Sequence, residues 1–416
     1  MAEDSAKSEK SLIDPEMRAE GLQIKPTIDN FYRLMENHYG ENLRLNEMTG
    51  KPEFKRHGRW MEWTDTEESR MRSYFERQYS MYNQQKMTDA LMIYFNNHKV
   101  NPLLDILDKL VWDGKPRVEH FLHDVMKAED NEYTRECSRL IFAGGIHRAF
   151  RPGCKFYDMI VLIGDQGGGK STIVRWLNIE DQFYQEIKTI NGKEGIEAIR
   201  GVWIGEVAEL MAMTRVKEAE AVKAYITSQK DSYRPPYQKN VQTIPRPCVF
   251  IGTTNNPQFL TDKTGNRRFY PVQCHADGYK LLDNEEAVRE YIRQAWAEAV
   301  QLYKADNLQP FAKKEVLELI RAAQEAAMED DWRVGAIEQY LEDMKKPPNS
   351  TVSVIELWHK ALSEPDESKP ARGDSIAISQ IVLNVPGWAK GAGKISTPWG
   401  RQKFFRKVNP FFPAWR

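Results

Sequence analysis

The feature that most constrains the fold is a short apolar run that leads into a glycine-rich loop and then into a helical pattern. Met159 to Ile163 is continuously apolar, and Gly164-Asp-Gln-Gly-Gly-Gly-Lys-Ser171 follows it directly. The next residues, STIVRWL, have helical spacing. The order strand, glycine loop, helix is typical of a loop whose backbone N–H groups enclose phosphates together with the helix N-terminus. The alternative is a glycine-rich surface turn, which does not need the flanking strand and helix.

Composition sets the scale and the class of the chain. Its 416 residues predict roughly two to three domains. Hydrophobic residues make up 41% and charged residues 29%, which is typical of a globular protein. The formal net charge is -1, so there is no basic field over the whole protein. Any site for a polyanion must therefore be local.

The cysteines and the apolar runs indicate a compartment. The four cysteines have no C-x-x-C spacing, and the first residues contain no apolar run of the kind found in a signal peptide. The longest apolar stretch is far shorter than a membrane span. We expect a cytoplasmic protein with no membrane partner.

Short apolar runs and amphipathic segments alternate after the glycine loop. Apolar runs recur at Val202 to Ile204 and at Val249 to Gly252, and a helical pattern from Val216 to Ile226 separates them. Strands that alternate with helices predict a parallel α/β core. We expect an α/β fold with a P-loop NTPase core between a helical N-terminal module and a helical C-terminal module that would suit a winged helix.

Composition shifts suggest five parts along the chain. The segment KKPPNST, for example, is typical of a linker. The expected parts are an N-terminal module with a disordered start (1–100), a helical collar-like segment (101–150), the P-loop ATPase core (151–305), a helical extension (306–345) and a C-terminal module with a basic tail (346–416).

A P-loop ATPase also needs an acidic residue after a neighbouring strand, to hold Mg²⁺ and to orient the attacking water. Glu206 follows the second apolar run, and Glu209 lies three residues further on. Ser171 and Glu206 are the candidate metal ligands. Which glutamate would activate water is left open, and either could instead be a surface or N-cap residue.

Three further residues are candidates for the chemistry. Asn255 ends the third apolar run, where an amide could bind the γ-phosphate or the attacking water. Arg267 and Arg268 lie in a turn that leads back into an extended segment. A guanidinium stabilises the charge of a transferred phosphoryl group, often from an adjacent subunit, so either arginine is a candidate finger. The alternative is a solvated surface patch.

Two segments are candidates for nucleic-acid binding. The first, SYRPPYQKN, is aromatic and cationic, and Arg234, Tyr237 and Lys239 could track a single strand by charge and stacking. A packed connector is the alternative. The second is the tail from Ala389 to Arg416, which has seven cations and no acidic residue.

The series of motifs NPLLDILDKLVWDGKPR, RPGCKFYDMIVLIGDQGGGKST, VWIGEVAEL, SYRPPY and CVFIGTTNNPQFLTDKTGNRRFYPV resembles the virulence-associated protein E family. These are P-loop ATPases of phages, prophages and genomic islands, similar to superfamily 3 helicases. The resemblance implies a bacterial host and an AAA+-like or superfamily 3 core. It further implies a hexameric ring with ATP at subunit interfaces and single-stranded DNA in its channel. It also implies roles for Lys170 and Ser171 on phosphate and Mg²⁺, Glu206 as the second-motif acid, Asn255 as sensor, Arg267 or Arg268 as finger, and Arg234 and Lys239 on DNA.

The sequence thus supports a specific hypothesis and two rivals. The hypothesis is an ATP- and Mg²⁺-dependent DNA helicase or translocase for replication of a phage, prophage or genomic island, with a separate primase or other replication proteins as partners. One rival is an initiator or regulator that uses ATP only as a switch. The other is a P-loop enzyme acting on a small molecule. The expected ATP-binding residues are Gly164, Asp165, Gln166, Gly167, Gly168, Gly169, Lys170, Ser171 and Thr172.

Overall fold

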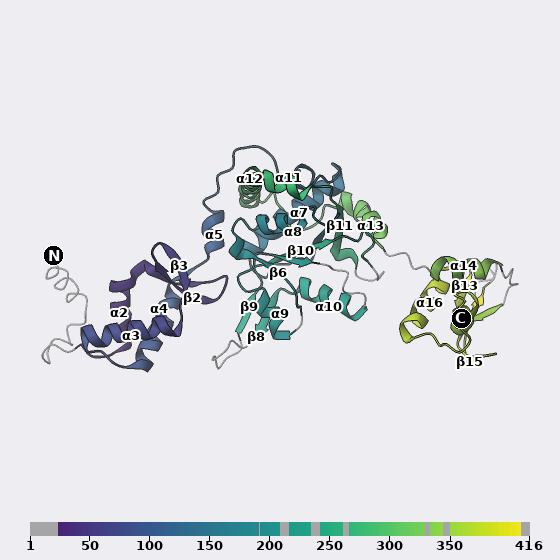
Figure 1. Cartoon of the computed structure of the whole chain (residues 1–416), viewed down its shortest axis with the longest axis horizontal. Coiled ribbons are helices and arrows are strands. Elements are labelled where there is room, and N and C mark those ends of the chain that lie inside the picture. The colour runs from purple at the N-terminus through teal and green to yellow at the C-terminus, as the bar shows by residue number, and fades with distance from the viewer. Residues whose placement is uncertain are drawn as a thin grey trace. The chain divides into compact units, whose positions relative to one another are not determined.

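The computed structural model divides the chain into two compact units, Met1–Met328 and Glu329–Arg416 (Figure 1). It describes residues 24–190, 192–208, 216–233, 242–260, 266–328, 333–343 and 350–408. Four of the predicted site residues lie outside these ranges. They are Glu209, Arg234, Tyr237 and Lys239.

The first unit begins with a small α+β region. The sequence left an α+β or a helical module open for this stretch, and the structure corrects our choice of the helical one. A four-stranded sheet of order β3-β2-β1-β4 packs with three helices around Phe31, Phe75 and Tyr94. The sequence contains little sign of this sheet because β2 and β3 are short and mostly polar, so their few apolar residues do not alternate regularly. The elements are α2 (Ile28–Tyr39), β1 (Leu43–Asn46), β2 (Lys51–Arg56), β3 (Arg59–Glu62), α3 (Asp65–Tyr79), α4 (Gln84–Asn97) and β4 (Lys99–Val100).

Polar cross-strand pairs hold this sheet together. Arg44 of β1 pairs with Glu53 of β2 at 2.7 Å, and its guanidinium lies 3.9 Å from the ring centroid of Trp60 on β3. Such pairs are a unit of sheet stabilisation that apolar periodicity does not reveal.

The centre of the first unit is a five-stranded parallel sheet of order β11-β5-β10-β7-β6, which confirms the predicted parallel α/β core. All five residues of β5 are buried. Ile160 and Leu162 belong to one core and Val161 to the other, because successive side chains of a strand point to opposite faces. The strands are β5 (Met159–Ile163), β6 (Tyr184–Glu186), β7 (Ile204–Ala208), β10 (Val249–Thr254) and β11 (Phe269–Gln273).

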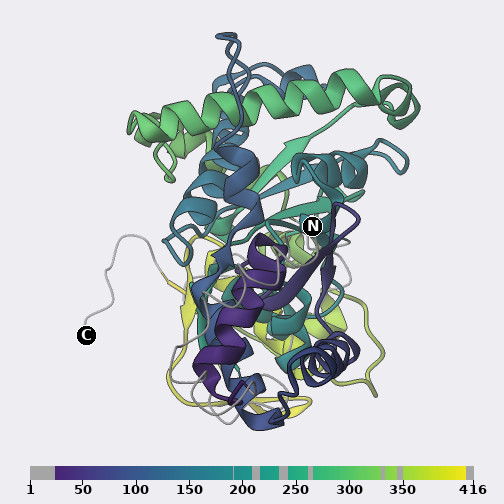
Figure 2. The same ribbon diagram turned by 90° about the vertical axis from the view of Figure 1, so that its left-hand side faces the viewer.

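Helices cover both faces of this sheet. On one face α7, α8 and α12 pack together, where the Trp296 ring lies 4.7 Å from Phe142 and 4.3 Å from Trp203, centroid to centroid. Figure 2 shows α12 as the long green helix. On the other face, Val222 and Ile226 of α10 join the second core. The helices are α7 (Glu132–Phe150), α8 (Lys170–Leu177), α10 (Val216–Thr227) and α12 (Glu285–Lys304), with the shorter α5 (Pro102–Leu107), α6 (Phe121–Asp124), α9 (Gly192–Ala198), α11 (Gly278–Asp283) and α13 (Leu317–Ala326).

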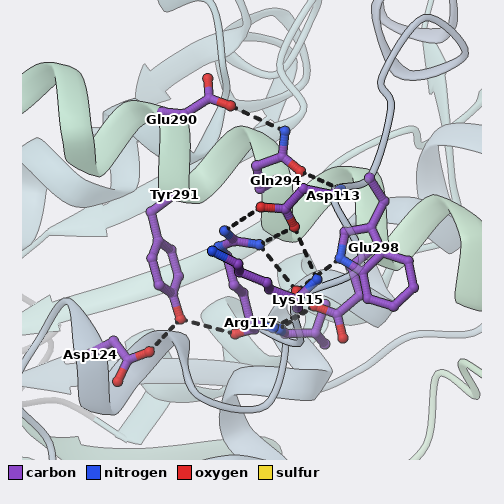
Figure 3. A network of polar contacts seen from close by, with 10 residues as sticks. Asp113, Lys115, Arg117, Asp124, Glu290, Tyr291, Gln294 and Glu298 are labelled. Carbon is purple, nitrogen blue, oxygen red and sulfur yellow. Dashed lines mark hydrogen bonds and ion pairs between the residues drawn. The ribbon is translucent and has the colours of Figure 1, made fainter.

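The segment WDGKPR, which we predicted to be a turn, is fastened to α12 (Figure 3). The backbone N–H groups of Arg117 and Val118 donate to the buried Glu298 carboxylate at 2.5 and 2.9 Å. The Arg117 side chain also binds Asp113 with two hydrogen bonds, which holds the pKa of that carboxyl well below its usual range. The turn therefore has a defined conformation although it lies at the surface.

Asp158 precedes β5 and makes the stability of the first unit depend on pH. Burial raises its pKa from 3.8 to about 6, although a hydrogen bond with Tyr270 acts in the opposite direction. Because the folded chain holds this proton more tightly than the unfolded chain, the contribution of Asp158 to the free energy of unfolding is full below about pH 4 and is lost as pH rises to about 6.

Asp158→Asn removes this ionisation and is expected to stabilise the chain mainly at neutral pH. The stability gained over the parent chain should grow by about 1–2 kcal/mol between about pH 4.5 and about pH 7.5. Urea unfolding followed by the fluorescence of the buried Trp203 and Trp296 measures it. An equal stability difference at both pH values would contradict the assignment.

The second unit has its own core, around Ile337, Leu357, Val382 and Phe405. The predicted helical extension, 306–345, is divided between the units, since α13 packs on β11 and α14 packs on α16. The elements of this unit are α14 (Arg333–Asp343), β12 (Thr351–Ser353), α15 (Val354–Lys360), α16 (Arg372–Asn384), β13 (Trp388–Lys390), β14 (Ile395–Thr397), β15 (Gly400–Gln402) and β16 (Phe404–Lys407). Among the described residues of both units, no helix combines the length and the apolar character that crossing a membrane requires.

Candidate nucleotide site

The glycine loop connects the buried strand β5 to the first residue of α8. Gly167 and Gly169 have φ angles of 83° and 77°, a left-handed conformation that favours glycine. The start of α11 presses against the loop, because a Cβ atom added to Gly278 would lie 2.0 Å from the Gly167 carbonyl oxygen. The loop therefore takes a compact path that side chains at these positions would obstruct.

Lys170 is the first residue of α8, and its side chain folds back over the loop. It is only 8% exposed, and its Nζ donates to the carbonyl oxygens of Gly164 and Asp165 at 2.7 and 2.8 Å. A third hydrogen bond, 2.9 Å long, reaches Oδ1 of Asn255. Burial lowers the pKa of Lys170. An anion in the loop would favour the charged ammonium and so offset this cost.

Glu206 of β7 is 1% exposed and accepts hydrogen bonds on both carboxylate oxygens. Oε1 accepts from Ser171 Oγ and Thr253 Oγ1, both at 2.7 Å. Oε2 accepts from the Tyr184 hydroxyl at 2.5 Å. Burial, and then this hydrogen bond, raise the pKa of Tyr184. The hydroxyl groups thus take the place of solvent around a buried carboxylate.

The parallel order of the strands brings these side chains together. In the register, Thr254 of β10 pairs with Ile163 of β5, and Thr253 pairs with Ala208 of β7. The carboxyl ends of the three strands therefore meet at one edge of the sheet, where the glycine loop leaves β5. Ligands of open α/β sheets bind outside this edge.

A cavity of about 410 Å³ lies over this edge. Eight of the predicted residues line it, together with residues from the ends of β7 and β10 and from α11. The predicted lining residues are Gln166, Gly167, Gly168, Gly169, Lys170, Ser171, Thr172 and Asn255.

Sequence reasoning missed Tyr184 and Tyr279. Tyr184 lies on the three-residue strand β6, which has no apolar periodicity, so nothing in the sequence connects it to Glu206. Tyr279 lines the cavity and is 82% exposed. A large aromatic side chain exposed beside a glycine loop could stack on a ring, and the local sequence does not reveal that position.

Arg267 and Arg268 do not lie with the other candidates. They form a short 3₁₀ turn (Asn266–Arg268) directly before β11, whose first residue, Phe269, pairs with Met159 at the start of β5. The glycine loop lies beyond the other end of β5, roughly 16 Å along a five-residue strand. The two arginines therefore lie at the opposite edge of the sheet from Lys170 of the same chain.

The predicted DNA-binding segment lies between two antiparallel strands. β8 (Lys230–Tyr233) pairs with β9 (Gln242–Pro245) as an antiparallel hairpin. Its predicted contact residues Arg234, Tyr237 and Lys239 lie outside the described residues. At its base, Arg246 donates two hydrogen bonds to Asp231 and stacks on Tyr225, with its Cζ 4.5 Å from the ring centroid. This base is well anchored in the first unit.

The donors present fit a magnesium ion that shares its coordination with phosphate and water. Within the described ranges, no group of three or more His, Cys, Asp or Glu side chains could hold a metal alone. Mg²⁺ characteristically binds through one or two protein oxygens and completes its shell with substrate phosphate and water. The Ser171 hydroxyl and the Glu206 carboxylate, 2.7 Å apart, are such a pair of oxygens.

A larger cavity, of about 560 Å³, lies away from this edge and is lined by Arg139, Glu298 and Lys313. Its charged groups already bind other groups of the same chain. Arg139 binds Glu136 with two hydrogen bonds, and Glu298 accepts from the turn described above. These charged groups therefore stabilise the fold around the cavity, and we do not assign a functional site to it.

The fold and the site define a class of protein: a parallel α/β protein in which a glycine loop, a buried carboxylate and an amide meet at the carboxyl edge of the sheet. The chain belongs to the virulence-associated protein E-like domain family, whose sequence profile matches residues 107–329. That range contains the whole site and ends where the first unit ends.

Solved structures of the NrS-1 C-terminal region are similar to this chain. Its apo structure has a TM-score of 0.49 and 13% identity, and covers 91% of this chain and 98% of that chain. The A form apo structure has a TM-score of 0.48 and 13% identity, and covers 92% of this chain and 100% of that chain. No curated protein matches the sequence.

Proposed function

We propose that the chain is an ATP-dependent DNA helicase or translocase of superfamily 3 type that acts in replication of a phage, prophage or genomic island. One observation carries the proposal: Lys170, Ser171, Glu206 and Asn255, which come from three separate segments, are joined by hydrogen bonds at one edge of the sheet. Those are the residue types that phosphoryl transfer requires around a glycine loop. Family membership supports the mobile-element setting.

In this proposal each side chain has a distinct task. Lys170 binds the β- and γ-phosphates once it exchanges its loop carbonyls for them. Ser171 and Glu206 would hold Mg²⁺, which would neutralise phosphate charge and orient the triphosphate. Asn255 leaves Lys170 and donates to the γ-phosphate or orients the attacking water. Tyr184 and Thr253 keep the Glu206 carboxylate in position.

The arginines would complete the site of a neighbouring subunit. Since Arg267 and Arg268 lie at the opposite sheet edge from their own glycine loop, a finger from either must act between chains. In a head-to-tail ring, the sheet edge that carries the arginines of one subunit faces the ATP site of the next subunit. Every ATP would then have an arginine from a neighbouring chain. The β8–β9 hairpin, with Arg234, Tyr237 and Lys239, would contact single-stranded DNA in the channel.

The test is ATP hydrolysis by the full chain with and without single-stranded DNA, with strand separation of a forked duplex scored in the same reaction. Strong stimulation by DNA together with strand separation is the expected result. Hydrolysis that ignores DNA would favour an enzyme acting on a small molecule and would reject the motor.

Mixing two inactive variants tests the shared site. Arg267→Ala or Arg268→Ala removes the finger, and Lys170→Ala removes the phosphate contact. At equal amounts, about one quarter of the head-to-tail interfaces would pair an intact lysine with an intact arginine. We expect phosphate release to recover toward that fraction for whichever arginine is the finger. Mixtures that stay inactive at every ratio would contradict a shared site.

A second candidate function is an initiator or regulator switched by ATP. Both oxygens of Glu206 are occupied by hydroxyl donors and the side chain is 1% exposed, an arrangement suited to holding Mg²⁺ and poorly suited to taking a proton from water. DNA binding that depends on ATP, with slow hydrolysis and no strand separation, would favour this candidate.

A further inference from the structure

The second unit lies beyond the residues that the family profile matches and has a topology of its own. Its elements run α14, β12, α15, α16, β13, the β14–β15 hairpin and β16. The strands β12, β16 and β13 form an antiparallel sheet in that order. A helix pair backed by a three-stranded sheet, with a hairpin between its last two strands, is the arrangement of a winged helix-turn-helix. In Figure 1 the hairpin strand β15 lies at the edge of this unit.

Charge is strongly segregated along this unit. No acidic residue follows Asp374 anywhere in the sequence. Six cations lie in the stretch that begins with β13 and ends with β16, and five of the six are exposed. They are Lys390, Lys394, Arg401, Lys403, Arg406 and the half-buried Lys407. In a chain whose net charge is -1, this is a local surface complementary to a polyanion.

α16 packs against β13 and also has a partly apolar face that is exposed. Arg372, Ile376, Gln380 and Leu383 recur at helical spacing and are exposed, with Ile376 52% exposed. Asp374 is the one acid of the helix, and Arg333 of α14 pairs with it at 2.7 Å. The helix therefore offers amide and aliphatic groups without a free negative charge.

The chemistry of that face suits the major groove of DNA. Glutamine pairs with the edge of adenine, aliphatic side chains contact the thymine methyl group, and an α-helix fits the groove width. In RNA duplexes the major groove is too narrow for such a helix. B-form DNA is therefore the duplex that α16 fits.

The hairpin is fixed to the body of the unit. Trp399, in the turn between β14 and β15, stacks on His359 of α15 with ring centroids 5.0 Å apart and planes 26° from parallel. β13 packs against α16 and leads directly into the hairpin. The cations of the hairpin thus keep a defined position, which lowers the entropic cost of binding.

We propose that the second unit binds double-stranded DNA, with α16 in the major groove and the β14–β15 hairpin on neighbouring phosphates. This activity is separate from the single-strand contacts of the proposed motor and does not depend on ATP. It would hold the chain on the duplex next to the strand that the first unit acts on.

The test compares two double variants of the full chain, each of which removes two exposed lysines from the second unit. Lys394→Ala with Lys403→Ala removes charge on both sides of the hairpin. The control, Lys360→Ala with Lys369→Ala, removes it from α15 and from the acidic loop after it. Fluorescence anisotropy without ATP measures binding to duplex DNA, single-stranded DNA and duplex RNA over a range of salt concentrations.

We expect the hairpin variant to bind duplex DNA roughly tenfold more weakly, with the slope of log K against log salt smaller by about 2, because two phosphate contacts are lost. The control and single-strand binding should not change. Equal duplex affinities of the hairpin variant and the control would overturn the proposal. The proposal would also be overturned if the parent chain bound duplex RNA as tightly as duplex DNA and the hairpin variant weakened RNA binding equally. The major groove of an RNA duplex is too narrow for α16, so that binding would not involve a helix in the groove. Variants of the nucleotide site that lose ATPase activity test the proposed motor. They do not test duplex binding by the second unit, which is measured without ATP.

Discussion

Lys170→Ala is expected to abolish ATP hydrolysis, with phosphate release at least roughly a hundredfold slower than in the parent chain. The ammonium group is the cation held at the mouth of the glycine loop, on the carbonyls of Gly164 and Asp165 and on Asn255. Its loss removes both the charge that binds the phosphates and the contact that positions Asn255. Steady-state phosphate release and binding of a fluorescent ATP analogue measure the two effects.

A matched control exists on α11. Lys280 is exposed and directly follows Tyr279, which lines the same cavity. Lys280→Ala removes a nearby charge without touching the loop and should retain activity. If Lys170→Ala kept the turnover of the parent chain, this edge of the sheet would not be the working site, and the proposed function would be rejected.

Glu206→Gln is expected to separate binding from hydrolysis. Glutamine keeps the size of the side chain and can accept from Ser171 and Thr253 through its amide oxygen, so the cluster should stay folded. It lacks the negative charge that holds Mg²⁺ and polarises water. Hydrolysis should fall by roughly two to three orders of magnitude while the ATP analogue still binds, and the Mg²⁺ concentration for half-maximal activity should rise.

Glu186→Gln is the control for this variant. Glu186 pairs with Glu206 in the register of the neighbouring strands, but it is half-exposed and lies 4.0 Å from Lys188. Its replacement should leave turnover unchanged. If Glu206→Gln hydrolysed ATP at the parent rate, Glu206 would not hold the Mg²⁺ that hydrolysis requires, and its proposed task would be rejected.

Local sequence patterns were sufficient for the centre of the first unit. The buried strand Met159–Ile163 and the start of α8 at Lys170 were predictable because an apolar run, a left-handed glycine loop and a helical period are properties of neighbouring residues. The run that we expected at Val202 to Ile204 became β7, shifted to Ile204–Ala208, because its pairing with β10 and β6 decides where the strand begins.

Polar strands were not predictable in the same way. The N-terminal sheet is held by pairs such as Arg44 with Glu53, whose partners are nine positions apart and carry no periodic signal. The predicted helical extension, 306–345, formed one part in the sequence, yet only packing assigned α13 to one unit and α14 to the other.

The sequence by itself therefore determined the parallel α/β core, the family and the residue types of the candidate site, because each depends on motifs within short segments. Only the tertiary structure decided which side chains from those segments contact one another. It placed Tyr184 and Thr253 on the Glu206 carboxylate and put Arg267 and Arg268 at the far edge of the sheet. The physical reason is that strand order and register set distances between residues far apart in the chain, and these distances leave no mark on the local pattern.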